Sequence, residues 1–404
     1  MRILRASGLR GFSFGAAILF VVVAVGTTAL VRASGRQIFD VELYRTYGDA
    51  MESGLVPYRD FDVEYPPAAL PVFVLPAFAN GEDYGSAFEL LMWACAVVMI
   101  VLLATTLAAV EASPARLYGA TAFAGIAPLL IGSVILTRFD LWPAALVAGV
   151  LAALVLGRDR LGLGLLGLAT MAKIYPAVLL PIAVVWVARR RGLREAFICL
   201  GVFAAVVVAI ALPFAILSPG GLAHSVTTQL GRPLQIESLG AAVLLAANQL
   251  GAYHPTIVST HGSQNLDGTL PDVLATIETA LGVAALLAVW VVFARGRMER
   301  DRLMIASAAA VVAFIAFGKV LSPQFLIWLI ALVPLVAGTV GVAACWLLAA
   351  ALVTTQIWFP YRYWDVVALQ PVGWLVLLRD VLLVALFAVL LAAIRPGSAD
   401  SRSA

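Results

Sequence analysis

Ionisable and hydroxyl-bearing side chains concentrate in one stretch near the start of the chain, from Phe39 to Pro71. This stretch is dense in acids, tyrosines and prolines, and it directly follows a long apolar run. So many ionisable groups near a membrane boundary are typical of a functional site. We therefore expect this stretch to form a working surface, on which a carboxylate could deprotonate a substrate hydroxyl.

Two lysines, Lys173 and Lys319, are the only ones among the 26 basic residues of the chain. Each lies between two short apolar segments, where an unpaired charge is expensive. Each should therefore meet an anion, and a compact ammonium group suits a phosphate. The competing interpretation is that both ammonium groups extend along their aliphatic stems to the polar interface.

A larger set of polar residues is expected on the same outer side of the protein: Asp40, Glu42, Arg59, Asp60, Asp62, Glu64, Arg138, Asp140, Lys173, Arg232, Glu237, Lys319 and Gln324. Carboxylates combined with lysines at hydrocarbon depth suit a substrate with an anionic head and an apolar tail. A polyprenyl phosphate sugar has this form. Its phosphate would bind Lys173 and a neighbouring cation, which would also stabilise the charge that develops on the departing phosphate.

The elements that must position these residues are membrane helices. The chain is 63% hydrophobic and only 12% charged. Five segments approach the ~20 residues that a spanning helix needs: Phe12 to Val31, Glu89 to Val110, Ala196 to Leu217, Val273 to Ala294 and Gly373 to Ile394. We predict an all-α polytopic membrane protein with about 10–13 transmembrane or re-entrant helices. The internal repeat typical of transporters is not evident in the sequence.

The arginines predict the orientation in the membrane. Sixteen of the 26 basic residues lie at the termini or in one alternating set of connections, which the positive-inside rule assigns to the cytoplasm. Both termini are then cytoplasmic, and residues 32–85 and 218–271 form two large outer loops. We expect a single integral-membrane domain over residues 1–404, located in the plasma membrane with its site on the extracytoplasmic face.

Residues 161–188 are too short to cross the membrane twice. Arginines flank both ends, and two arms of 12 and 15 residues would rise only ~18 and ~22 Å against a hydrocarbon core of ~30 Å. We predict a re-entrant hairpin with Lys173 at its tip. Arg138 and Asp140 share another tight turn, where they could form an interfacial ion pair or face the same cavity as the first outer loop.

Several other classes of site are disfavoured. The net charge of +3 is too small to indicate a nucleic-acid partner. The sequence contains no phosphate-binding G-x-x-x-x-G-K-[ST] loop, and Gly162, Gly164 and Gly167 are better explained by close helix packing. The three cysteines lie in apolar segments without metal-ligand spacing. His254 and His261 are interpreted as ordinary loop residues.

Taken together, the polar motifs resemble those of the GT-C superfamily of lipid-phosphate-sugar glycosyltransferases, and more closely those of glycosyltransferase family 87. The matching segments occur in order along most of the chain: Asp40 to Tyr47 with Pro57-Tyr58-Arg59-Asp60-Phe61 and Glu64-Tyr65-Pro66-Pro67; Arg138-Phe139-Asp140-Leu141 with Pro143; Lys173-Ile174-Tyr175-Pro176; Arg232-Pro233-Leu234-Gln235-Ile236-Glu237-Ser238; and Lys319-Val320-Leu321-Ser322-Pro323-Gln324. The resemblance implies transfer of a sugar, with mannose preferred, from a polyprenyl-phosphate donor to a lipid-linked or cell-envelope glycan. The Ala-, Arg- and Gly-rich composition also suggests an actinobacterial source.

The resemblance also implies roles for individual residues. Asp40 would be the general base, although Glu42 and Glu64 are alternatives and Asp40 could instead cap the helix that follows it. Lys173, with Arg138 or Lys319, would hold the donor phosphate. Expected substrate-binding residues are Arg59, Glu64, Tyr65, Asp140, Tyr175, Arg232, Glu237 and Gln324. No cofactor is implied with certainty, and the family leaves room for a divalent cation.

Three alternative functions remain at the level of sequence. The donor could carry arabinose instead of mannose. The protein could be a transporter or flippase for a lipid-linked sugar, although the crowding of carboxylates on one side is unlike alternating access. It could also be a non-catalytic partner in envelope assembly.

Overall fold

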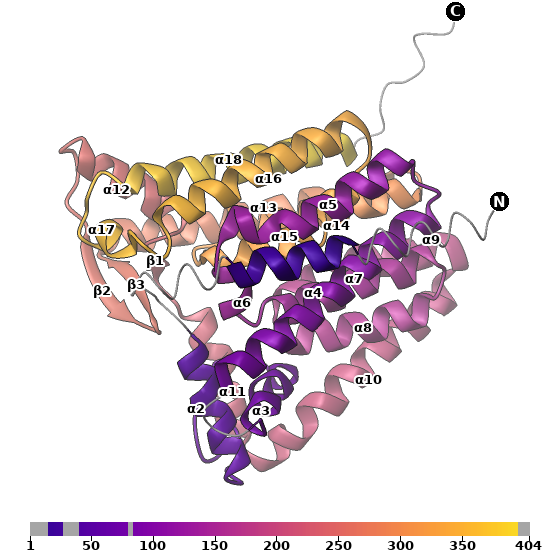
Figure 1. Ribbon diagram of the computed structural model, residues 1–404, viewed down its shortest axis with the longest axis horizontal. Coiled ribbons are helices and arrows are strands. Elements are labelled where there is room, and N and C mark those ends of the chain that lie inside the picture. The colour runs from indigo at the N-terminus through magenta and orange to yellow at the C-terminus, as the bar shows by residue number, and fades with distance from the viewer. Residues whose placement is uncertain (1–14, 27–39, 80–83, 395–404) are drawn as a thin grey trace, which may run out of the picture. The chain divides into compact units, whose positions relative to one another are not determined.

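The structure is a computed structural model that describes residues 15–26, 40–79 and 84–394. It contains two compact units (Figure 1). Unit 1 comprises Met1–Ala177, Phe197–Arg232 and Leu326–Ala331, and unit 2 comprises Val178–Ala196, Pro233–Phe325 and Leu332–Ala404. The single membrane domain over residues 1–404 stays a prediction. Of the expected first outer loop, residues 32–39 and 80–83 lie outside the described residues.

Six helices in the described part of the chain are long and apolar enough to cross a membrane: α4 (Tyr84–Ala109), α5 (Pro114–Ile131), α10 (Leu193–Leu217), α13 (Thr269–Arg295), α16 (Gly338–Trp358) and α18 (Gly373–Ile394). A helix of 26 residues such as α4 rises ~39 Å, which exceeds the ~30 Å hydrocarbon core. The predicted α-helical, polytopic membrane fold is therefore confirmed. Its expected first span, Phe12 to Val31, is described only as the helix Gly15–Gly26.

The other helices of unit 1 are α2 (Val41–Glu52), η1 (Pro67–Ala69), α3 (Leu70–Ala77), α6 (Val134–Thr137), α7 (Leu141–Val155), α8 (Asp159–Ala172), α11 (Pro219–Leu230) and α15 (Leu326–Ile330). The centre of this unit is α7, which packs on α4, α8 and α15. It contains no charged residue and buries all but one of its 15 side chains, so it forms the core against which the polar segments are held.

Glycines allow the helices of unit 1 to approach closely. A Cβ atom at Gly162 of α8 would lie 2.9 Å from the Leu154 side chain of α7, and one at Gly167 would lie 2.9 Å from the Phe203 carbonyl of α10. Real Cβ atoms almost never approach other atoms this closely. The Leu154 side chain could shift to make room, but the Phe203 backbone carbonyl could not, so the contact of α8 with α10 depends on Gly167. The predicted role of these glycines in helix packing is confirmed.

The chain leaves α8 at Ala172, passes Lys173 in an extended conformation and enters η3 (Tyr175–Leu179) and α9 (Leu180–Arg191). Both arms of the predicted hairpin are thus helical, and the break between them falls at the predicted lysine. Whether the hairpin is re-entrant stays a prediction, as does its depth in a membrane.

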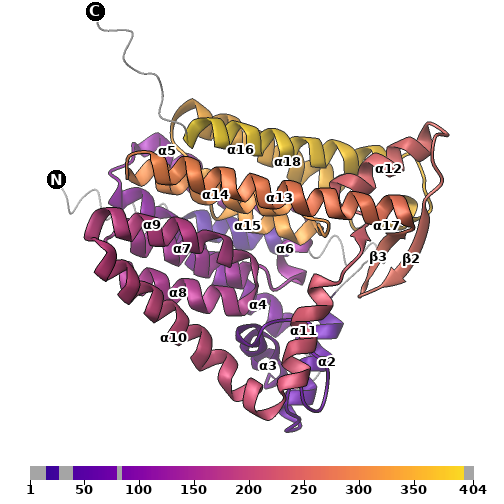
Figure 2. The ribbon, with the colours of Figure 1, turned by 180° about the vertical axis from the view of Figure 1, so that it is seen from behind.

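Unit 2 also contains α12 (Leu239–Gln249), α14 (Arg300–Ala316), η4 (Pro323–Phe325), η5 (Val333–Leu335) and α17 (Tyr363–Val367). In this unit α18 packs against α16, α14 and α12, and α13 runs beside α14 (Figure 2). Six residues of α12 are buried against its neighbours within the unit.

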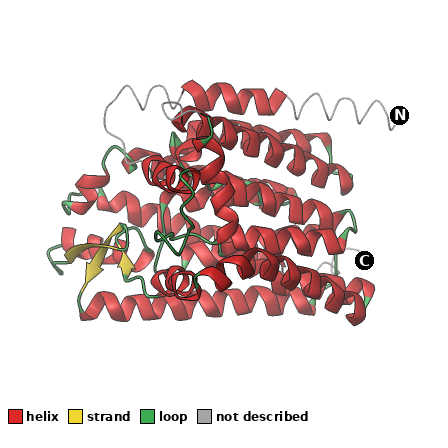
Figure 3. Ribbon diagram, turned by 90° about the horizontal axis from the view of Figure 1, so that it is seen from below, coloured by secondary structure: helices red, strands yellow, loops and turns green. Residues whose placement is uncertain are grey.

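A small antiparallel sheet in unit 2 was not anticipated from sequence (Figure 3). Its strands are β1 (Leu234–Gln235), β2 (Thr256–Thr260) and β3 (Ser263–Asp267), in the order β1-β3-β2. His261 and Gly262 join β2 to β3 with φ angles of 53° and 65°. Two successive residues with positive φ are typical of a two-residue hairpin turn. His261 is thus a turn residue, which agrees with its interpretation as an ordinary histidine.

In unit 2, arginine side chains donate hydrogen bonds to backbone carbonyls near the ends of neighbouring helices. Arg189 Nη1 donates to the carbonyl oxygen of Ala294 at 3.0 Å, so the connection after α9 lies beside the connection after α13. Arg302 Nε donates to the carbonyl of Ile394 at 3.0 Å, and Arg302 Nη2 donates to that of Val292 at 3.0 Å. Cations at helix C-termini satisfy carbonyls that lack helical partners. These contacts group two of the arginine-rich connections used to predict the orientation. The arginines of both termini lie outside the described residues, and the cytoplasmic location of the termini stays a prediction.

Candidate active site

Asp40 precedes the first turn of α2 in unit 1, but it does not cap that helix. Its backbone is helical, and its side chain forms no capping hydrogen bond. The carboxylate Oδ1 instead lies 2.6 Å from Arg138 Nη1. Tyr44, one turn along α2, directs its hydroxyl toward the other carboxylate oxygen, Oδ2, at 3.5 Å. The Asp40 side chain is 30% exposed, so a substrate can reach it.

Arg138 lies in the short extended connection between α6 and α7, and its side chain is only 4% exposed. Burial alone would lower the pKa of this guanidinium, but Asp40, together with Tyr44, Tyr65 and Asp140, outweighs that effect and the pKa is raised. Arg138 is therefore a permanent cation held against the Asp40 carboxylate.

Asp140 forms a second pair on the far side of Phe139 in the sequence. Its oxygen Oδ1 accepts hydrogen bonds from Lys173 Nζ at 2.6 Å and from Trp328 Nε1 at 2.6 Å. The Asp140 side chain is completely buried, while that of Lys173 is 13% exposed. Arg138 and Asp140 therefore bind different partners and do not form an interfacial ion pair at their own turn.

Aromatic rings fix the position of the Lys173 ammonium. Nζ lies 4.6 Å from the centre of the Phe139 ring and 5.2 Å from that of Trp328. The electron-rich faces of such rings attract cations. Tyr175, two residues after Lys173, stacks on Trp328 with the ring centres 3.9 Å apart. The sequence analysis missed Trp328, because nothing in its apolar surroundings marks it as a partner of Asp140.

A cluster of rings lies beside the two charge pairs. Phe73 stacks on Tyr44 at 4.7 Å between ring centres, and Phe139 contacts Tyr65 edge-on at 4.9 Å. Burial raises the pKa of Tyr44 and of Tyr65 well above the usual value, with nearby acids adding to the effect. Both phenols are therefore neutral at physiological pH.

The resulting arrangement is a series of alternating charges, Asp40, Arg138, Asp140 and Lys173, with formal charges that cancel. The series has a half-exposed carboxylate at one end and a slightly exposed ammonium at the other. A carboxylate can accept a proton, and an ammonium can stabilise an anion. The unit thus combines a candidate base with a candidate anion site.

The other predicted residues of unit 1 lie on the segment after α2, just after α11 or in η3. Arg59 pairs with Asp60 on the surface at 2.8 Å. The Glu64 backbone carbonyl accepts a hydrogen bond from Gln229 Nε2 at 3.5 Å, and Arg232 Nη1 donates to Gln229 Oε1 at 3.2 Å. Tyr65 belongs to the ring cluster, and Tyr175 belongs to the Lys173 site.

The remaining predicted residues, Glu237, Lys319 and Gln324, lie in unit 2. Gln235 connects two of their segments, because its side-chain amide donates to Glu237 Oε2 and its backbone N–H donates to the Lys319 carbonyl. Gln324 is half-buried in η4. Their part in a substrate site stays a prediction.

Within the part of the chain that the structure describes, no group of three or more His, Cys, Asp or Glu side chains is placed to hold a metal ion. His254 contacts Asn248 at 3.2 Å between Nδ1 and Nδ2.

These features define a polytopic, mainly helical membrane protein in which an accessible carboxylate adjoins buried cations. Residues 64–323 match the sequence model described as Glycosyltransferase family 87. This range covers more than half of the chain, and the protein belongs to glycosyltransferase family 87. Arg138, Asp140 and Lys173 lie inside the matched range, whereas Asp40 precedes it.

Comparison with solved structures finds similarity to ArnT from Cupriavidus metallidurans bound to undecaprenyl phosphate. The sequence identity is 16% and the TM-score is 0.48, over 93% of this chain and 76% of that one. No curated protein sequence matches this chain.

Proposed function

We propose that this protein transfers a mannosyl unit from a polyprenyl-phosphate donor to a lipid-linked or cell-envelope glycan at the extracytoplasmic face of the plasma membrane. Its membership of a glycosyltransferase family supports the reaction class. The observation that carries the assignment of residues is that one short segment, Arg138 to Asp140, contacts both the accessible Asp40 carboxylate and the Lys173 ammonium.

Asp40 acts as the general base. Its Oδ1 is held by Arg138, so Oδ2 is the oxygen that accepts the proton of the acceptor hydroxyl. As that proton leaves, the acceptor oxygen forms a bond to the anomeric carbon of the donor sugar. The bond between that carbon and the phosphate oxygen breaks, and its electron pair stays on the polyprenyl phosphate.

The structure favours Asp40 over the two alternative bases. Glu42 is exposed on the first turn of α2. Glu64 is anchored through its backbone by Gln229. The Asp40 carboxylate lies 2.6 Å from the buried Arg138 guanidinium, which fixes the carboxylate for reaction.

Lys173 and Arg138 hold the donor phosphate and stabilise its charge as it leaves. The aromatic rings around Lys173 leave it little freedom, so this stabilisation needs no reorganisation during the reaction. We assign Lys319 to the same phosphate, and Glu237 and Gln324 to the sugar or acceptor. These last three assignments rest on the family resemblance.

A transfer assay tests the proposal. Membranes that contain matched amounts of wild type, Asp40→Asn or Glu42→Gln would be supplied with radiolabelled polyprenyl-phosphate mannose. We expect transfer by wild type, loss of about 100-fold or more in Asp40→Asn, since general-base catalysis contributes 10²–10⁴-fold, and near-normal transfer in Glu42→Gln. Glu42→Gln is the control because it neutralises an exposed carboxylate two residues away.

Three results would contradict the proposal. Full activity of Asp40→Asn would remove Asp40 from the mechanism. Wild type that is inactive with mannose but active with polyprenyl-phosphate arabinose would change the sugar. Inactivity with both donors would exclude transfer from these lipids and favour a carrier of lipid-linked sugars.

A further inference from the structure

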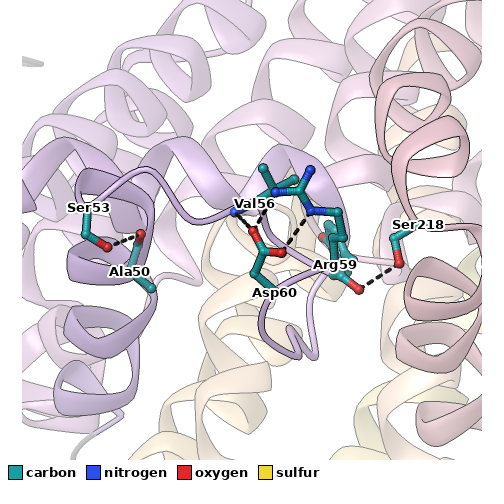
Figure 4. Close-up of polar contacts among 7 residues, drawn as sticks. Ala50, Ser53, Val56, Arg59, Asp60 and Ser218 are labelled. Carbon is teal, nitrogen blue, oxygen red and sulfur yellow. Dashed lines mark hydrogen bonds and ion pairs between the residues drawn. The ribbon is translucent and has the colours of Figure 1, made fainter.

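The segment that follows α2 is a tight loop closed by its own hydrogen bonds. Tyr58 N donates to the Phe61 carbonyl at 2.9 Å, and Asp60 N donates to the Val56 carbonyl at 2.9 Å. The Asp60 carboxylate accepts the Val56 N–H at 2.8 Å and pairs with Arg59, as Figure 4 shows. These bonds make residues 56–61 rigid, so a contact at one residue can fix the position of the whole loop.

The residue that fixes the loop is Tyr58. It adopts a left-handed backbone with φ of 66°, a conformation that costs a residue with a side chain roughly 1 kcal/mol. Its ring is buried against Phe214 of α10, with ring centres 5.3 Å apart. Its hydroxyl donates to the Tyr65 carbonyl at 2.5 Å, so Tyr58 also determines where Tyr65 lies. An unfavourable backbone that tertiary contacts maintain is typical of functional segments.

The carbonyl of Tyr58 is held by the start of α11. Ser218, which precedes this helix, donates its hydroxyl to the Tyr58 carbonyl oxygen at 2.8 Å, and Figure 4 shows Ser218 facing the loop. A Cβ atom at Gly221 would overlap the same oxygen, whereas one at the adjacent Gly220 would meet nothing within 4 Å. The contact of Tyr58 with Ser218 and Gly221 therefore requires glycine at position 221 but not at position 220.

The same helix holds the segment at a second place. Near the end of α11, Gln229 donates to the Glu64 carbonyl at 3.5 Å. The Tyr65 ring then contacts Tyr44 with ring centres 6.0 Å apart, and Tyr44 directs its hydroxyl to the reactive oxygen of Asp40. The contacts thus run without interruption from α11 through Tyr58 and Tyr65 to Asp40.

We propose that Tyr58 is a positioning residue for sugar transfer, and that its contact with Ser218 and Gly221 sets the placement of Tyr65 and Tyr44 around the Asp40 base. This inference rests on the proposed function. It assigns to α11, at the start of the second outer loop, the role of supporting the base. The contacts of Tyr58 lead to Asp40, the proposed base that takes the proton of the acceptor hydroxyl, so the contact acts on the acceptor step.

The adjacent glycines provide a matched test. Alanine is a better helix former than glycine by ~1 kcal/mol, so Gly220→Ala and Gly221→Ala change α11 itself in the same way. Gly221→Ala must in addition push the Tyr58 carbonyl away by roughly 1 Å, and a displacement of that size can cost up to ~100-fold in rate. We expect kcat to fall about 10- to 100-fold in Gly221→Ala with the KM for the donor unchanged. Gly220→Ala should match wild type in both constants.

Two further variants separate positioning from folding. Ser218→Thr keeps the hydroxyl and should retain activity, whereas Ser218→Ala should lose a few-fold in kcat. Hydrogen exchange provides a readout independent of activity, and it should be faster across residues 56–66 in Gly221→Ala than in Gly220→Ala. Thermal unfolding of each purified variant serves as the folding control.

Several outcomes would overturn the inference. Equal kcat in the two glycine variants would do so, as would a loss in Gly221→Ala that is explained entirely by less folded protein. A changed donor KM with unchanged kcat in Gly221→Ala would show that the contact acts on donor binding and not on the base. Inactive wild type would overturn the proposed function together with this inference. Equal hydrogen exchange in the two variants would overturn only the inference that Gly221 positions the Tyr58 loop.

Discussion

Each unit of the protein contains a buried cluster of charges, and the two clusters are built differently. In unit 1, the pairs join distant parts of the sequence and reach the surface, with Asp40 30% and Lys173 13% exposed. In unit 2, Arg379 and Asp380 are neighbours on α18, lie 2.6 Å apart and are fully buried. Arg379 also donates to the Glu237 carbonyl at 2.6 Å.

The difference indicates different roles. A charge that remains partly exposed can exchange its partner for a substrate, and its desolvation is incomplete. A charge pair that is fully enclosed cannot react with a substrate without unfolding its surroundings. We infer that the unit 1 pairs serve chemistry, while the Arg379–Asp380 ion pair holds β1 and α12 against α18.

The largest expected effect compares the same chemical change in the two clusters. Asp380→Asn leaves the buried Arg379 charge without a counter-charge, which typically costs ~3–5 kcal/mol. We expect a strong fall in the amount and thermal stability of the protein but unchanged transfer per folded molecule, opposite to Asp40→Asn. Thermal unfolding and normalised transfer measure the two effects.

The double variant Arg379→Met with Asp380→Leu supplies the control for that prediction. Replacing a complete buried pair by apolar residues is often neutral or stabilising, so this variant should be more stable than Asp380→Asn. Loss of transfer per folded molecule in either variant would show that the unit 2 cluster takes part in the reaction. The two clusters would then not differ in role.

An intermediate effect is expected for Trp328→Phe. This change keeps a ring beside Lys173 but removes the hydrogen bond to the buried Asp140, and a bond to a charged group contributes ~1.5–3 kcal/mol. We expect the donor KM to rise about 10-fold because Lys173 and Asp140 lose their common anchor. Measuring transfer over a range of donor concentrations separates KM from kcat.

Trp358→Phe is the matched change in unit 2. Trp358 is fully buried, and within the described residues its Nε1 has no hydrogen-bond partner. This variant should therefore affect stability only through the lost volume and leave the donor KM unchanged. A similar KM shift in both variants would mean that the Trp328 hydrogen bond has no special role.

The smallest effect concerns the exposed loop that Tyr58 holds. Hydrogen bonds from the Arg59 side chain, and then from the Val56 backbone, lower the pKa of Asp60 to about 2. A lowered pKa means that this carboxylate stabilises the folded loop above its unfolded pKa of ~4, and that the contribution disappears as the pH falls toward 2. Since the pair is exposed, the effect should be slight.

Hydrogen exchange of residues 56–61 at pH values from 2 to 5, with correction for the intrinsic rate, measures this effect. Protection should fall between pH 4 and pH 2 in wild type and should be low and nearly constant in Asp60→Asn. An identical pH profile in the two proteins would show that Asp60 does not close the loop.

Much of the fold could be predicted because the relevant signals are local. Apolar segments such as Gly373 to Ile394 identify membrane helices by length alone. Lys173 followed by Pro176 marks a helix break, and Gly162 and Gly167 indicate close packing. Four of the five residues of β2 are β-branched, but the hairpin was missed because β3 is short and polar and its His-Gly turn lacks the usual sequence pattern.

The candidate site shows the same boundary between local and tertiary information. Residue types and family motifs identified Asp40, Arg138, Asp140 and Lys173 as a group, but not which of them pair. Asp140 meets Lys173 across 33 residues and Trp328 across 188. Such pairings depend on how the helices of unit 1 pack, because a side chain at the end of a helix can reach only what its neighbours bring within hydrogen-bond distance.

The sequence by itself thus determined the membrane helices, their breaks and the kinds of reactive group. Tertiary packing alone decided that Arg138 faces Asp40, that Trp328 anchors Asp140 and that Tyr58 contacts Gly221.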